Sequence, residues 1–109
     1  MSLAIMIDDQ EPGGLYVCVS GEASYETYWC PAIKALELKW APYFQAGCSF
    51  GKEDWPEVSQ EISQTRNWIL RNLCEEGNPR YEWFCCRFDS IISEVELYFQ
   101  SDGRQLWIG

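Results

Sequence analysis

The sequence predicts one α+β domain, in which a small antiparallel sheet packs against two long helices and one short helix. Two observations lead to this prediction. Apolar residues recur at a helical period over 53–76 and 80–99. Short apolar runs near both ends of the chain, Leu3–Ile7, Leu15–Val19 and Arg104–Ile108, are typical of strands.

The two N-terminal runs are expected to pair as a hairpin. The residues between them, 8–14, are acidic and contain Pro12, Gly13 and Gly14, which predicts a loop at its tip. Ser20–Ser24 predicts a second turn.

The region after this turn fits more than one interpretation. Tyr25–Trp29 alternates in a way that predicts an edge strand. Pro31 suits the first turn of a helix, and a short helix to about Trp40 is preferred, although Leu36–Trp40 also alternates as a strand does. The residues that follow, 45–52, are expected to form a loop.

The first long helix is expected over Glu53–Glu76. Its apolar stripe consists of Val58, Ile62, Thr65, Ile69 and Leu73. Asp54 is positioned to cap the helix, with Glu57 three residues later as in a capping box, and Glu61 falls on the solvent side. Gly77 is expected to end it.

The second long helix is expected over Arg80–Phe99. Its apolar stripe consists of Tyr81, Phe84, Phe88, Ile91, Ile92, Val95 and Phe99. Alternation at both ends of this segment leaves a strand pair open as the alternative. The closing strand is expected to join the hairpin and to bury Leu106 and Ile108 on one face.

Composition sets bounds on the class of protein. Residues 1–109 are expected to form a single domain, and an apolar content of 47% disfavours disorder. The net charge of −9, from 17 acidic and 8 basic residues, predicts repulsion from nucleic acid and from anionic membranes. It favours a basic protein partner, with plain solubility as the alternative reading.

The cysteines and the N-terminus predict a cytoplasmic protein with reduced thiols. No export signal and no bilayer-length apolar run are present in the sequence. The six cysteines show no C-x-x-C spacing and the chain has no histidine, so neither a metal site nor a cofactor is expected. Most of the cysteines are expected to act as small core residues.

The sequence predicts that the protein is not an enzyme. Without histidine, a Ser-His or Cys-His nucleophile pair is impossible, and no glycine-rich phosphate loop is present. Paired acids at Asp8–Asp9, Glu53–Asp54 and Glu75–Glu76 leave open a small-molecule-binding or enzymatic domain that uses carboxylates. Adjacent acids in loops are, however, more often solvated.

The remaining prediction is an interaction surface in which aromatic side chains lie among acids. Its candidate partner-binding residues are Asp8, Asp9, Glu11, Glu22, Tyr25, Glu26, Tyr28, Trp29, Glu53, Asp54, Trp55, Glu57 and Glu61. Aromatic anchors flanked by acids suit a basic protein. The alternative is a solvated acidic rim over a core that includes these rings.

Residues 28–76 resemble small bacterial immunity proteins, which are encoded beside polymorphic or contact-dependent toxins. The resemblance lies in Tyr28-Trp29-x-Pro31-Ala32, Leu36-x-Leu38, Phe44-x-x-Gly47 and a helix that opens at Asp54-Trp55. It implies a compact α+β domain that binds a cognate toxin and occludes its active site, with no catalytic residues to carry over. An acidic inhibitor suits a basic nuclease toxin. A structural homo-oligomer, such as a homodimer that buries exposed aromatic rings, is a further alternative.

Overall fold

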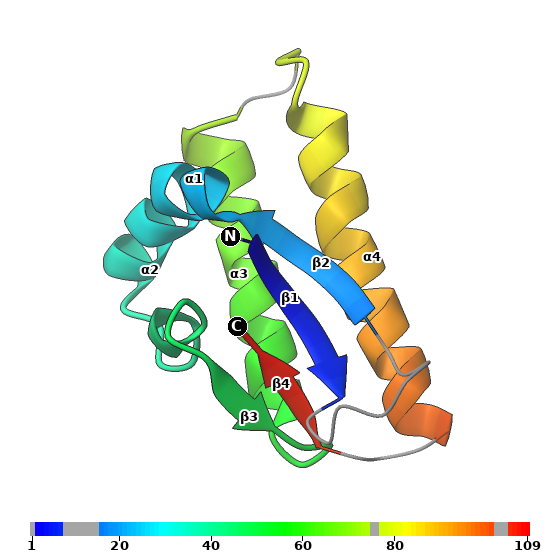
Figure 1. Cartoon of the computed structure of the whole chain (residues 1–109). Helices are drawn as coiled ribbons and strands as arrows, with labels where there is room; N and C mark the ends of the chain where they lie inside the picture. The colour runs from blue at the N-terminus through cyan, green and yellow to red at the C-terminus, as the bar shows by residue number, and fades with distance from the viewer. Residues whose placement is uncertain (1, 8–15, 75–76, 102–104) are drawn as a thin grey trace.

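The structure is a computed structural model, and it describes residues 2–7, 16–74, 77–101 and 105–109. In chain order its elements are β1 (Ser2–Ile7), β2 (Tyr16–Gly21), α1 (Glu22–Ser24), the π-helix η1 (Tyr25–Trp29), α2 (Cys30–Leu36), the 3-10 helix η2 (Ala41–Tyr43), β3 (Cys48–Phe50), α3 (Trp55–Asn72), α4 (Tyr81–Ser101) and β4 (Leu106–Ile108). The fold is of the predicted α+β class. Figure 1 shows the strands lying across one side of the antiparallel helices α3 and α4.

The sheet is antiparallel, with strand order β2-β1-β4-β3. The predicted hairpin and closing strand are confirmed, because β1 pairs with β2 on one side and with β4 on the other. Ile5 lies opposite both Val17 and Ile108, and all three side chains are buried. Leu106 and Ile108 are both 0% exposed, as predicted. The hairpin tip at 8–14 lies outside the described residues.

The predicted loop over 45–52 contains the edge strand β3, which pairs with β4. Only three residues form this strand, too few to show an alternating pattern in the sequence. Gly47 precedes β3 with a φ of +99°, and a Cβ there would lie 2.3 Å from Cζ2 of Trp107. Glycine is therefore required at this position both by the backbone and by the ring above it.

The predicted edge strand at Tyr25–Trp29 is wrong, because these residues form the π-helix η1 within a helical segment that runs from Glu22 to Leu36. The predicted turn before it is also replaced, since β2 runs to Gly21 and α1 follows directly. Tyr25 and Trp29 lie on the same side of the helix, are each 2% exposed, and stack with their ring centroids 5.8 Å apart. Their spacing therefore reflects a helical turn that faces the core.

The short helix α2 ends at Leu36, earlier than predicted. Glu37 adopts a left-handed conformation with φ of 52°, and the backbone N–H groups of Glu37 and Leu38 both donate to the Ile33 carbonyl. This is a helix C-terminus of the kind that glycine usually provides. Because Glu37 occupies it, the sequence carries no stop signal there.

The two long helices are confirmed, although α3 ends at Asn72 and not at Gly77 as predicted. The strand-pair alternative for 80–99 is wrong because α4 is continuous. Val58, Ile62 and Ile69 of α3 and Phe88 and Ile91 of α4 are all buried in the core beneath the sheet. The aromatic ring of Phe88 stacks on Trp29, with ring centroids 5.2 Å apart. The core therefore joins both helices, the sheet and the η1 segment.

The start of α3 differs in detail from the predicted capping box. Asp54 is the N-cap residue, but its carboxylate accepts a hydrogen bond from the Gly51 backbone N–H at 3.1 Å and none from the helix. Glu57 is bonded elsewhere, to the indole N–H of Trp40. The Asp54 carboxylate therefore stabilises the turn that precedes α3, and it does not cap the backbone N–H groups of the helix.

Candidate functional site

The predicted interaction surface does not assemble as a whole. Tyr25, Trp29 and Trp55 are 2%, 2% and 7% exposed, so these three rings belong to the core. Tyr28 is half-buried, with its ring edge-on to Phe84 at 4.7 Å between centroids. Three of the four aromatic side chains expected on the outside therefore lie in the core, and Tyr28 is partly exposed.

The predicted acids differ in exposure. Glu26, Glu53 and Glu57 are exposed, Asp54 is half-buried, and Glu61 is only 8% exposed. Asp8, Asp9 and Glu11 lie outside the described residues, as does the side chain of Glu22. The structure therefore leaves Glu26, Glu53 and Glu57 as the described candidates with carboxylates open to solvent.

Glu61 has a structural role, and its predicted solvent position is wrong. Its carboxylate accepts the backbone N–H groups of Lys39 at 3.2 Å, of Trp40 at 2.9 and 3.0 Å, and of Ala41 at 3.0 Å. One turn earlier on α3, Glu57 accepts the Trp40 indole N–H at 3.1 Å. Together the two acids fasten the segment between α2 and η2 onto α3, and Glu61 satisfies N–H groups at the start of η2.

Two open clefts flank this contact on the side of α3 that faces α2. The larger, about 310 Å³, is lined by Leu36, Glu37, Leu38, Lys39, Glu57, Gln60, Glu61 and Gln64. The smaller, about 210 Å³, is lined by Leu36, Gln64, Asn67, Trp68, Arg71 and Asn72. Their walls are rich in carboxamides, and the two acids on α3 are already hydrogen-bonded within the chain. The two clefts could therefore form hydrogen bonds with a ligand, but the α3 carboxylates that line the larger cleft are not available as a catalytic pair.

The outer side of α4 carries large apolar side chains in solvent. Trp83 is 42% exposed and Leu97 is 69% exposed. A hollow of about 180 Å³ lies beside the first of them, lined by Trp83, Cys86, Arg87 and Ser90. None of these residues was among the predicted site residues. The available signal was the helical stripe through Phe84 and Phe88, which leaves Trp83 outside it.

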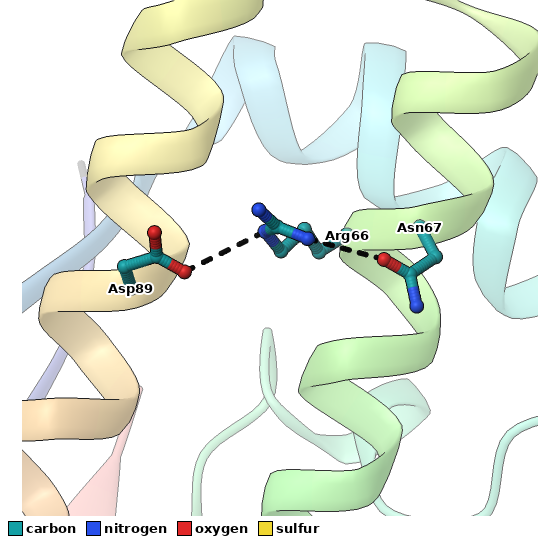
Figure 2. Close-up of polar contacts among 3 residues, drawn as sticks. All are labelled: Arg66, Asn67 and Asp89. Atoms are coloured by element: carbon teal, nitrogen blue, oxygen red, sulfur yellow. Dashed lines mark hydrogen bonds and ion pairs between the residues drawn. The ribbon is translucent and has the colours of Figure 1, made fainter.

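The arginine side chains next to this surface have partners within the chain. The guanidinium of Arg87 lies 5.2 Å from the centre of the Trp83 ring and donates a hydrogen bond to the Cys18 carbonyl of β2 at 3.2 Å. Arg66 of α3 reaches Asp89 of α4, with Nε and Oδ1 3.6 Å apart, and also donates to the Asn67 side chain (Figure 2). The positive charges near α4 therefore help hold its neighbours in place.

Three of the cysteine thiols are not activated as nucleophiles. Burial raises the pKa of Cys48, and burial followed by the nearby Glu26 carboxylate raises the pKa of Cys30. Burial also raises the pKa of Cys74. A raised pKa leaves less thiolate at neutral pH, and thiolate is the reactive form.

The prediction that most cysteines lie in the core is wrong, because only Cys74 is buried, while Cys18 and Cys86 are exposed.

Two further features of the described residues bear on function. No group of three or more Cys, Asp or Glu side chains in the described part of the chain is placed to hold a metal ion. Among the helices of those same residues, none combines the length and the apolar character that crossing a membrane requires.

Comparison of this chain with protein-family models, with curated proteins and with solved structures finds no match in any of the three.

Proposed function

We propose that this chain is a non-enzymatic, acidic protein-binding module of the immunity type, which binds a basic toxin in the cytoplasm and occludes its active site. The observation that carries the proposal is the pair of exposed apolar side chains on α4, Trp83 and Leu97, on a chain of net charge −9. Exposed aromatic side chains often anchor protein interfaces, and Trp is enriched among the residues that dominate binding energy. The negative field favours encounter with a basic protein.

The charge distribution supports a basic partner. Exposed carboxylates occur on η1, at the start of α3 and along α4, as at Glu26, Glu53, Glu82 and Glu94. Glu61, by contrast, is buried and bonded within the chain. Free cysteines throughout the described structure suit a reducing compartment such as the cytoplasm.

A carboxylate enzyme is less well supported. Glu57 and Glu61 line the same cleft, which is the arrangement that acid catalysis would need. The Glu61 oxygens, however, accept three backbone N–H groups, and Glu57 accepts the Trp40 indole. A general acid or base must instead be free to exchange a proton with a substrate.

The test is co-expression with the products of the adjacent genes, followed by purification and measurement of the association rate at increasing salt. We expect a basic protein to co-purify, and its association to slow as salt screens the acidic surface. Loss of the toxin's activity in the complex is the functional readout. An association rate that does not change with salt would contradict the role given to the acidic charge.

A further inference from the structure

We propose that the partner docks on the outer face of α4 and that the docking segment is a basic amphipathic helix. This inference rests on the proposed function only for the basic character of the partner. It is carried by the order of the residues along α4, by their exposure and by the charges beside them.

The exposed residues of α4 repeat at intervals of seven. Trp83, Ser90 and Leu97 form one such row, and Cys86, Ser93 and Gln100 form the next. Seven residues are close to two turns of an α-helix, so these rows lie side by side along the helix as in the contact face of a coiled coil. We call this face of six residues the seam.

The seam faces away from the core. Its members are exposed, whereas Phe84, Phe88, Ile91 and Val95 of the same helix are buried beneath the sheet. The large side chains of the seam lie near its two ends, and the residues between them, such as Ser90 and Ser93, are small. Small side chains let a second helix approach closely, and the hollow beside Trp83 offers a place for one of its side chains.

A row of acids runs along one side of the seam at the same interval. Glu82, Asp89 and Glu96 are all exposed, and the Asp89 side chain stays 66% exposed although it pairs with Arg66 (Figure 2). Arg87 lies on the other side of the seam. Its guanidinium contacts the Trp83 ring and donates a hydrogen bond to the Cys18 carbonyl of β2. Residues flanking a helical seam select its partner by charge, so the acidic row favours lysine and arginine on the incoming helix.

A second copy of this chain fits the seam less well. In an antiparallel pair the acidic row would face its own copy, and in a parallel pair Asp89 would face the flank that holds Glu94. Like charges in such positions are destabilising. The charge pattern therefore selects a basic helix over self-association.

The test uses a synthetic helical peptide of three heptads as the probe. The peptide has leucine along one apolar face and lysine on both sides of that face. Its affinity is measured by calorimetry beside a scrambled peptide of the same composition. We expect Trp83→Ala and Leu97→Ala each to weaken binding about tenfold. Tyr43→Ala is the matched control, because Tyr43 is 63% exposed on η2, outside the seam. Loss of affinity in Glu82→Gln and Glu96→Gln, and weak binding of the scrambled peptide, would support the proposal further.

Results that contradict the docking site differ from results that contradict the proposed function. Equal binding of the ordered and scrambled peptides, or equal losses for Trp83→Ala and Tyr43→Ala, would overturn the docking site. A dimer in sedimentation that Leu97→Glu dissociates would assign the seam to a second copy instead. A natural toxin complex unaffected by Trp83→Ala and Leu97→Ala would also overturn it, while the proposed function would stand. Peptide binding that depends on Trp83, with no toxin inhibited, would support the seam and remove the proposed function.

Discussion

Replacing Glu61 by alanine should destabilise this protein more than removing an ordinary surface acid, because the Glu61 carboxylate accepts hydrogen bonds from three backbone N–H groups. Water can replace the carboxylate at exposed Lys39, but Ala41 is 0% exposed and Trp40 is half-buried. A buried donor left unsatisfied costs about 1–3 kcal/mol. Two such donors predict a loss of about 2–6 kcal/mol in the free energy of unfolding, a large part of the roughly 5–15 kcal/mol typical of a domain.

The assay is urea unfolding followed by circular dichroism. With a urea dependence of about 1–3 kcal/mol per molar, the midpoint for Glu61→Ala should fall by roughly 1 M or more. Glu61→Gln separates hydrogen bonding from volume, because it keeps the size of the side chain but turns an NH2 donor toward backbone donors. The carboxamide oxygen of glutamine in the Oε1 position can still accept the N–H groups of Trp40 and Ala41, so Glu61→Gln should lose less stability than Glu61→Ala. Glu94→Ala, an exposed site on α4, should stay within about 0.5 kcal/mol of the parent protein. A Glu61→Ala midpoint equal to that of Glu94→Ala would refute the assigned role.

Two further predictions concern the core and the sheet. Gly47 and Gly77 have nearly the same φ, +99° and +101°, but of these two only Gly47 would place an added Cβ against the Trp107 ring. Gly47→Ala should therefore lower the free energy of unfolding by about 1–3 kcal/mol more than Gly77→Ala, as measured by thermal unfolding. Equal melting temperatures for the two variants would contradict the contact with Trp107. Burial raises the pKa of Tyr25, whose hydroxyl donates to the Ala41 carbonyl at 2.7 Å. The protonated form is therefore favoured by folding, and its contribution is complete below the ordinary tyrosine pKa of about 10 and falls as pH rises above it. Tyr25→Phe should lose about 1 kcal/mol at neutral pH and show a shallower loss of stability in alkaline urea titrations, whereas an unchanged alkaline slope would count against Tyr25 as its source.

The long helices could be predicted from the helical spacing of their apolar residues, and the three principal strands from short apolar runs. Burial follows the predicted stripe of α3 through Val58, Ile62 and Ile69, whereas Leu73, just beyond the end of the helix, is 39% exposed. The central strand β1 lies between β2 and β4, and its successive residues Leu3, Ala4 and Ile5 are all buried. In these elements the local pattern and the tertiary contacts favour the same structure.

Other features depend on contacts between distant segments and could not be predicted from a local pattern. β3 is a strand because β4, far along the chain, pairs with it. Glu61 is spaced as a surface acid but is buried because the 39–41 segment folds back onto it. Tyr25 and Trp29 lie near acids in the sequence and were therefore predicted to be on the surface. In the structure their helical spacing directs both rings into the core. For this reason two of the aromatic side chains predicted for the interaction surface lie in the core.

The position of β4 between β1 and β3 has a consequence for how this protein is made. The pairing of Ile5 with Ile108 joins residues from opposite ends of the sequence, so it closes a very long loop, and contacts of this kind slow folding. During translation β1 keeps one hydrogen-bonding edge open beside β2, and β3 has no strand partner at all, until Leu106–Ile108 leave the ribosome. Nascent chains are therefore most exposed to aggregation just before the sheet is completed.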